Sequence, residues 1–325
     1  MALLNLFRKN DPFLNIILLI VLVLARLAYS FFGQSNFEEI DATSSYLFDV
    51  LSFSSDSTYI NIWISGLFLG INMLLINSII RNNEALSENN YLGGFIYLII
   101  TNSSEKYFVL SGALVASTCL LLALSMLLSH VKQRASEENI FFTGVLIGLS
   151  VLFYSPMSIF LILTLLVYVL YTRTIQRRYI LSSFGFCFPF ILYYSVSLFG
   201  DDRLTIEYFF SNLFSNGVEA ADLISYAFLI FPLALLLSKL LTSFGGLKMS
   251  NHQIHFHRLM FLVFISSVYV FFAIADDGFI WIIAIPATYF LSKSVLEINR
   301  NWIKTAVFYL LIAHLSMPFL SAAYF

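Results

Sequence analysis

The sequence predicts an all-α polytopic transmembrane bundle, and two observations lead to this fold class. The 325 residues are 59% hydrophobic and only 11% charged, with a mean hydropathy of +0.86. A soluble domain carries roughly 25% charged residues and about 45–50% apolar ones. In addition, apolar windows recur along the chain and give about eleven spans. The composition therefore excludes a soluble enzyme, a disordered chain and a nucleic-acid-binding protein.

The predicted spans make residues 1–325 a single integral-membrane domain. The segment 90–102 is the weakest of them, and it either spans or re-enters the membrane. The apolar run 139–172 is too long for one helix, and Pro156 in its middle favours two helices that meet at residues 154–156. The spans are expected near 14–32, 60–80, 90–102, 107–130, 139–154, 156–172, 179–199, 222–243, 259–275, 278–293 and 302–321.

The basic residues orient this layout. Of the 17 lysines and arginines, only Lys106 and Arg203 fall in the predicted outer loops, whereas Arg26 and Lys239 fall within spans. Because cytoplasmic loops are enriched in lysine and arginine, the N-terminus is predicted to be cytoplasmic. An odd number of spans then leaves the C-terminus outside.

The acidic residues gather on the other side, in two predicted outer loops at 33–59 and 200–221. The first loop contains Glu38, Glu39 and Asp41, followed by apolar residues whose spacing suggests a helix lying on the outer membrane surface. These carboxylates are either part of a solvated loop or catalytic groups at the mouth of a cavity. In the second case one of them acts as a general base or binds a divalent metal ion.

Arg26 is the most unusual residue of the first span. A cation within the membrane costs several kcal/mol unless it is paired or hydrated. One interpretation is that its side chain reaches the outer interface, near Glu38 and Glu39. The other is that it faces a polar cavity and binds a carboxylate or phosphate through two hydrogen bonds.

Two further acidic pairs follow outer ends of predicted spans. Asp201 and Asp202 precede Arg203, and Asp276 and Asp277 precede a glycine. The second pair is also typical of a tight turn. These pairs could instead support a site formed by the first loop, with Arg203 as a second phosphate ligand.

Other polar residues have mainly structural interpretations. The predicted inner loop 244–258 carries His252, His255 and His257, whose spacing fits no standard zinc site and favours a polar loop. In the second span, Asn61 and Asn72 share a helix face and are expected to bond neighbouring helices, or alternatively to line a polar path.

Pairs of small residues four positions apart predict close helix packing. The pairs are Gly66 and Gly70, Gly112 and Ala116, and Gly144 and Gly148. In contrast, no nucleotide-binding loop, serine-hydrolase elbow or zinc-protease motif is present, so the sequence gives no evidence for those activities.

Several short motifs resemble a family of uncharacterised multi-span inner-membrane proteins of Bacteroidota. They include the opening Phe7-Arg-Lys-Asn-Asp-Pro-Phe13, the stretch Asn89-Asn-Tyr-Leu-Gly-Gly-Phe-Ile-Tyr97 and the apolar run from Phe142 to Pro156. Arg177-Arg178, Gly185 and Pro189 complete the pattern. This resemblance covers nearly the whole chain and implies no settled activity.

A second resemblance is to integral-membrane glycosyltransferases of the GT-C type, which use polyprenyl-phosphate sugars. Those enzymes also start in the cytoplasm and leave the first span into an outer loop with acidic residues. Glu38 and Glu39 fall where that type places its catalytic acid. The chain departs from the type in its short first outer loop and in having no large outer C-terminal domain, so the resemblance implies the fold more than the activity.

Three functions are therefore carried forward. The first is a transferase that acts on a lipid-linked sugar at the outer face, with the phosphate bound by Arg26 or Arg203. The second is a non-catalytic scaffold subunit of a cell-envelope complex, with envelope proteins as partners. The third is a transporter or flippase, which would need a polar pathway near the middle of the bilayer.

Overall fold

The computed structural model describes residues 11–32, 58–86, 90–102, 108–132, 136–171, 176–197, 251–274 and 278–297. Every regular element within these residues is helical, which confirms the all-α class for this part of the chain. The elements are α2 (Phe13–Phe32), α4 (Thr58–Asn82), α5 (Leu92–Thr101), α6 (Gly112–Lys132), α7 (Glu137–Phe153), η2 (Ser155–Ser158), α8 (Ile159–Tyr171), α9 (Gln176–Ser197), α12 (Asn251–Ile274) and α13 (Phe279–Glu297).

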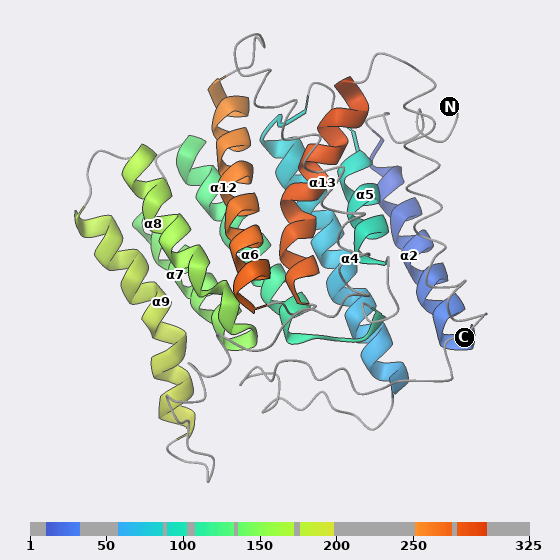
Figure 1. Cartoon of the computed structure of the whole chain (residues 1–325), viewed down its shortest axis with the longest axis horizontal. Coiled ribbons are helices and arrows are strands. Elements are labelled where there is room, and N and C mark those ends of the chain that lie inside the picture. Colours follow the sequence, from blue (N-terminus) through green and yellow to red (C-terminus); the bar gives the residue numbers. More distant parts are fainter. Residues whose placement is uncertain are drawn as a thin grey trace.

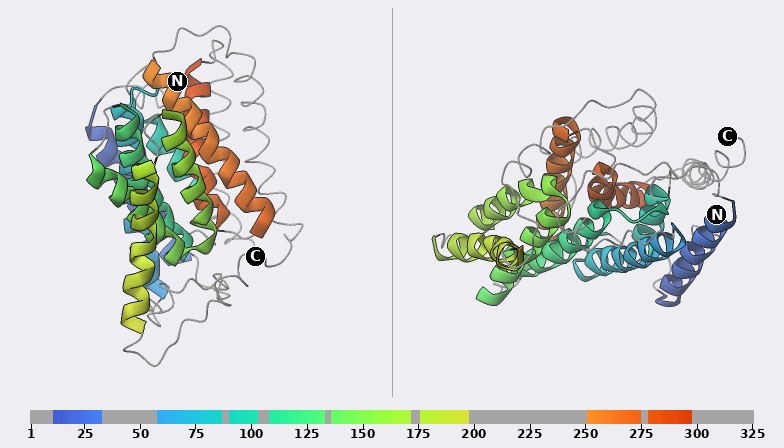
Figure 2. Two further views of the ribbon diagram at one scale, coloured as in Figure 1. Left: turned by 90° about the vertical axis from the view of Figure 1, so that its left-hand side faces the viewer. Right: turned by 90° about the horizontal axis from the view of Figure 1, so that it is seen from below.

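The described helices pack side by side in two layers (Figures 1 and 2). One layer runs in the order α2, α4, α6, α7 and α9, and each helix contacts the next. The second layer runs α5, α13, α12 and α8. The short helix α5 lies against α4 of the first layer and α13 of the second, so it occupies the interior of the bundle.

Five described helices are long and apolar enough to cross a membrane, which indicates a membrane-embedded protein. The predicted count of about eleven spans stays a prediction, because the spans at 222–243 and 302–321 lie outside the described residues. The five candidate segments are Phe13–Ser30, Tyr59–Asn82, Gly112–Ser129, Gln253–Val270 and Phe279–Leu296.

Apolar side chains cover the outside of the bundle as well as its core. Helix α9 exposes Ile180, Phe184, Phe188 and Ile191, which recur at helical spacing along one face. Ile180 alone is 70% exposed. An exposed apolar stripe of this length is unfavourable in water and favourable against lipid chains, since lipid tails are as apolar as the side chains themselves.

The predicted break in the run 139–172 is confirmed. Helix α7 ends at Phe153, Tyr154 is extended, and a 3-10 turn with Pro156 near its start leads into α8. Proline is common in the first turn of a helix, because the N–H groups there have no partner within the helix and the missing N–H of proline costs nothing. One apolar run therefore becomes two helices that pass through the bundle in opposite directions (Figure 1).

The glycine pair of α7 forms the closest helix contact in the first layer. A Cβ atom on Gly144 would collide with the backbone carbonyl of Ser182 in α9, and one on Gly148 with the carbonyl of Phe186. From the other side, a Cβ on Gly185 would collide with the carbonyl of Phe141. The prediction that such pairs serve close packing is confirmed for these residues.

The segment 90–102, the weakest of the predicted spans, forms the short helix α5. Its 10 residues give a length of about 15 Å, roughly half of the hydrocarbon layer. All of them are buried by neighbouring parts of the protein. A helix this short can end inside a membrane only where protein groups satisfy its terminal N–H and C=O groups.

The histidine-bearing segment differs from its prediction. His252, His255 and His257 do not lie in a loop, because α12 begins at Asn251, eight residues before the predicted span. Tertiary contacts explain the difference: Phe256 and His257 are buried and pack against Tyr289 of α13. The polar composition that suggested a loop therefore belongs to the first turns of a packed helix.

Basic residues of the described helices concentrate at one end of the bundle, which we call the basic end. This is the end at which α2, α7, α9 and α12 begin and α4, α6 and α13 finish (Figure 1). We call the opposite end the far end. The residues at or near the basic end are Arg81, Lys132, Arg177, Arg178, Arg258 and Lys293.

The contact between α7 and α9 can be tested by adding one methyl group. Gly144→Ala would push a Cβ atom into the Ser182 carbonyl, a backbone atom that cannot rotate away, so we expect a loss of about 1–3 kcal/mol of stability. Thermal unfolding in mild detergent measures this loss.

Gly70→Ala is the matched control. Its new Cβ would lie 3.2 Å from the Leu19 side chain, which can move aside. Equal melting temperatures for the two variants would contradict the backbone contact.

Candidate functional site

Arg26 lies inside the protein rather than at an interface. It is 1% exposed, and it lies six residues before the end of α2, about 9 Å from that end at about 1.5 Å per residue. Its Nη1 atom donates a hydrogen bond of 2.6 Å to the backbone carbonyl of Phe108. The Arg26 side chain thus lies in the far half of the bundle, buried against the segment that precedes α6. It is not exposed at a surface, and the hydrogen bond from Nη1 goes to a backbone carbonyl.

The Phe108 ring lies over this guanidinium, and Tyr29 stacks on that ring. The Arg26 Cζ atom lies 4.5 Å from the centre of the Phe108 ring, and the Tyr29 ring stacks on Phe108 at 4.2 Å between centroids. A cation over an aromatic face is stabilised by the ring quadrupole, by about 2 kcal/mol or more when both groups are out of water. Tyr29, Ile62 and Phe108 form a small buried apolar cluster of their own.

Gly66 of α4 provides the space for the arginine stem. A Cβ atom there would lie 3.3 Å from the Arg26 Cγ atom. One turn further along α4, a Cβ on Gly70 would approach Leu19 and Leu22 of α2. Gly66 and Gly70 therefore allow α2, with Arg26, to pack closely against α4.

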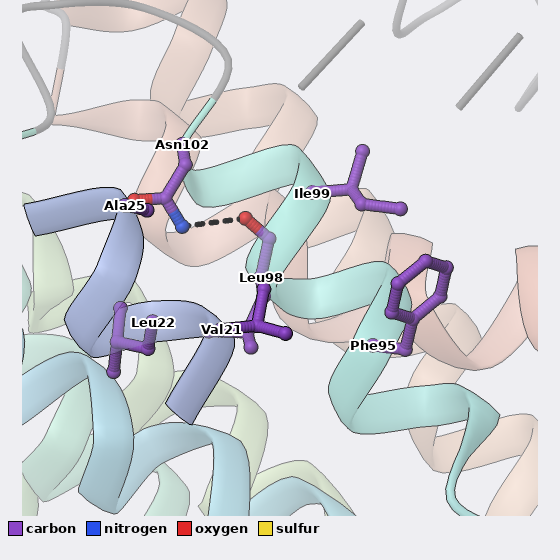
Figure 3. Close-up of a pocket in the computed structure, with 7 residues that line it drawn as sticks. All are labelled: Val21, Leu22, Ala25, Phe95, Leu98, Ile99 and Asn102. Atoms are coloured by element: carbon purple, nitrogen blue, oxygen red, sulfur yellow. Dashed lines mark hydrogen bonds between the residues drawn. The ribbon is translucent and has the colours of Figure 1, made fainter. Parts of the chain in front are cut away.

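A narrow pocket opens between α2 and α5, and its lining includes Ala25, the residue that precedes Arg26 in α2 (Figure 3). Leu22 and Ala25 line it from α2, whereas Phe95 and Ile99 line it from α5. Asn102 is the one polar residue of the lining, and its Nδ2 atom donates to the Leu98 carbonyl at 2.7 Å. The pocket has a volume of about 10 Å³, which is roughly the space of one water molecule.

A second polar group lies in the middle of the bundle. Asn72 of α4 donates from Nδ2 to the Tyr97 hydroxyl of α5 at 3.2 Å and to the Ser117 hydroxyl of α6 at 3.0 Å. All three side chains are completely buried. The predicted role of Asn72 in bonding neighbouring helices is confirmed, and the group joins three helices at one point.

Asn77 closes the first turn of α5. Its Oδ1 atom accepts a hydrogen bond of 2.6 Å from the Gly94 N–H, and its Nδ2 atom donates to Asn15 of α2 at 2.9 Å. Asn90 Oδ1 accepts from the Leu92 N–H at 3.2 Å. Glycine at position 94 is required here, because any Cβ would collide with the Asn77 amide. Side chains thus satisfy part of the N-terminal turn of a helix that begins in the interior.

A third polar group lies near the basic end. His257 Nδ1 and the Tyr289 hydroxyl are 3.2 Å apart, and Lys293 lies one turn beyond Tyr289 on α13. His257 and Lys293 are both buried. The three residues join α12 to α13, as the contacts of His257 with Phe290 also do.

Most of the predicted site residues lie outside the described residues. These are Glu38, Glu39, Asp41, Asp201, Asp202, Arg203, Asp276 and Asp277, so their predicted convergence remains a prediction. Within the described ranges, no three His, Cys, Asp or Glu side chains come together in a way that could hold a metal ion.

Sequence reasoning did not identify Phe108, Tyr97 or Ser117 as partners of Arg26 and Asn72. Phe108 lies 82 residues from Arg26, and its carbonyl can be contributed by any residue type. Tyr97 gave a usable signal, because a hydroxyl in the run Phe95-Ile-Tyr-Leu-Ile-Ile100 needs a buried partner.

Comparison with known protein families assigns the chain to one family. A family of unknown function, DUF6427, matches residues 94–323. The chain belongs to this family. No curated protein and no solved structure matches it. The matched region of this DUF6427 protein contains Phe108 and Tyr97 but not Arg26 or Asn72, so the two polar contacts join the matched region to the helices that precede it.

The cap on α5 gives a stability prediction. Asn77→Ala would leave the buried Gly94 N–H without its acceptor, so we expect a loss of about 1–3 kcal/mol in denaturant unfolding. Asn82→Ala is the control, because Asn82 lies exposed on the same helix. A loss for Asn77→Ala no larger than that of the control would show that another group caps α5.

The aromatic support of Arg26 gives a second prediction. Phe108→Leu keeps the carbonyl that accepts from Arg26 but removes the ring, which we expect to cost about 0.5–2 kcal/mol. Phe13→Leu, at the 58% exposed first residue of α2, should cost much less. If the two melting temperatures in detergent shift equally, the ring does not stabilise the guanidinium.

Proposed function

We propose that this protein is a transferase-like membrane protein that binds the phosphate of a lipid-linked sugar at the outer face of the inner membrane. The observation that carries the proposal is Arg26, a buried guanidinium in the far half of the bundle. Basic residues at the opposite end favour the cytoplasm for that end and the outer face for the far end. A guanidinium at this depth matches a phosphate located near the outer leaflet.

The surroundings of Arg26 support a lipid rather than a soluble phosphate. The sides of α2 and α5 that face each other are mostly apolar and include Leu22 and Ile99 (Figure 3). In this proposal the lipid chain packs on the apolar surface of α2, and its phosphate approaches Arg26. Burial of apolar area contributes about 25 cal/mol per Å² to such binding.

The proposed reaction uses the predicted outer carboxylates. An acceptor hydroxyl attacks the anomeric carbon of the sugar, and Glu38 or Asp41 removes its proton. The bond from the anomeric carbon to the phosphate oxygen breaks, and the electron pair leaves with the polyprenyl phosphate. Arg26, with Arg203, stabilises the negative charge that develops on that oxygen.

The binding step is tested with purified protein in lipid nanodiscs. Undecaprenyl phosphate should bind at least about tenfold more tightly than undecaprenol, which lacks the phosphate, because a charge-assisted pair contributes more than about 1.4 kcal/mol. Arg26→Gln should remove this preference, and Arg26→Lys should keep part of it. An unchanged preference in Arg26→Gln would overturn the assignment of Arg26.

The chemical step is tested in cells. The triple variant Glu38→Gln, Glu39→Gln, Asp41→Asn should lose the glycan product while its amount in the membrane stays normal. A wild-type glycan in this variant would exclude these three carboxylates as the catalytic groups.

Transport is a second candidate, because a specific feature favours it. Helix α5 is short, completely buried and flanked by capping asparagines, and interrupted helices of this kind form substrate sites in many transporters. Flux of a candidate substrate into proteoliposomes that is abolished by Asn77→Ala would favour this function over transfer. A non-catalytic scaffold subunit would instead be favoured by stoichiometric envelope proteins that copurify in mild detergent.

A further inference from the structure

Three polar side chains follow one face of α4 from the far end toward the middle of the bundle. Ser65 follows Asn61 by four residues and Asn72 follows Ser65 by seven, so at about 1.5 Å per residue they are roughly 6 and 10 Å apart along the axis. Both spacings are close to whole turns. The opposite face exposes Trp63, Leu67 and other large apolar side chains. The polar face is therefore directed into the protein.

Each of these side chains has an oxygen to which no described residue donates a hydrogen bond. Asn61 Oδ1, Ser65 Oγ and Asn72 Oδ1 are buried and have no hydrogen-bond partner among the described residues. Ser65 and Asn72 are 0% exposed. A buried polar atom without a partner costs roughly 1–3 kcal/mol, so three along one helix face are unfavourable in a dry interior.

We propose that Asn61, Ser65 and Asn72 line a hydrated track, which is a file of binding sites for water that runs from the far end to the Tyr97 hydroxyl. Water fits the three oxygens because each needs a hydrogen-bond donor. Buried waters typically make about three hydrogen bonds to otherwise unsatisfied polar groups. At the inner end, the Tyr97 and Ser117 hydroxyls supply further partners beside Asn72.

The charge of Arg26 selects water over a metal cation. Its Nε atom would lie 3.7 Å from a Cβ on Gly66, the residue next to Ser65. A fixed positive charge beside the track opposes a monovalent cation, whereas a neutral donor is unaffected. The track is independent of the proposed transfer reaction, because it requires neither a lipid phosphate nor the outer carboxylates.

Cysteine accessibility tests the track in the full-length protein. Cys119 and Cys187 are first replaced by alanine, and Ser65→Cys, Asn72→Cys and Met73→Cys are made in that background. Met73 is the matched control, since it is next to Asn72 and equally buried at 0% exposure. The reagent is 2-hydroxyethyl methanethiosulfonate, which is small, neutral and water-soluble, and intact-protein mass spectrometry measures the rate.

We expect Ser65→Cys and Asn72→Cys to react at least about tenfold faster than Met73→Cys, because the reactive thiolate forms only where water reaches the thiol. Rates equal to that of Met73→Cys would overturn the proposal.

Radiolytic footprinting of the wild-type protein provides a measurement that needs no substitution. Hydroxyl radicals form from water in place, so the Tyr97 ring should be labelled although it is 0% exposed. Phe160, which is equally buried, should remain unlabelled. Equal labelling of Tyr97 and Phe160 would also overturn the hydrated track.

Discussion

The absence of water from the hydrocarbon layer is the constraint on which this structure depends. Every buried N–H, C=O and charge needs a partner from the protein or from bound water, since each one left alone costs several kcal/mol. In helix α5, side chains satisfy backbone groups at both ends. The Asn77 amide oxygen of α4 accepts from the Gly94 N–H, and the Asn102 amide nitrogen donates to the Leu98 carbonyl. Arg26 satisfies the constraint with the carbonyl and the ring of Phe108. The same contacts fix the positions of α2, α4 and α5.

The features predicted correctly from the sequence are those that depend on local chemistry. Pro156 divides one apolar run into two helices because proline removes a helix hydrogen bond and is favoured in the first turn of the helix that follows, and Gly144 and Gly148 mark the face of α7 that meets α9. The position of Arg26 within a membrane helix was also evident. In contrast, the early start of α12 was missed, because the burial of His257 against Tyr289 depends on a helix 32 residues away in the sequence.

The partners of the polar side chains could not be predicted for a related reason. A hydrogen bond from Arg26 to Phe108, or from Asn72 to Tyr97, is determined by which helices are neighbours and at what depth they cross. Composition and periodicity identify the faces of helices but not their order in two layers. The same limit applies to the outer carboxylates, whose proposed role depends on the convergence of loops that are far apart in the sequence. The proposed function therefore depends on whether the far end of the bundle faces the outside of the membrane.

Orientation is the claim that connects Arg26 with the outer leaflet, and site-specific labelling tests it most directly. Glu84 lies exposed at the basic end between α4 and α5, and Ser155 lies at the far end between α7 and α8. In a background without Cys119 and Cys187, a membrane-impermeant maleimide should label Ser155→Cys in right-side-out vesicles. It should label Glu84→Cys only in inverted vesicles. The reverse pattern would place Arg26 near the cytoplasmic leaflet and would contradict the account.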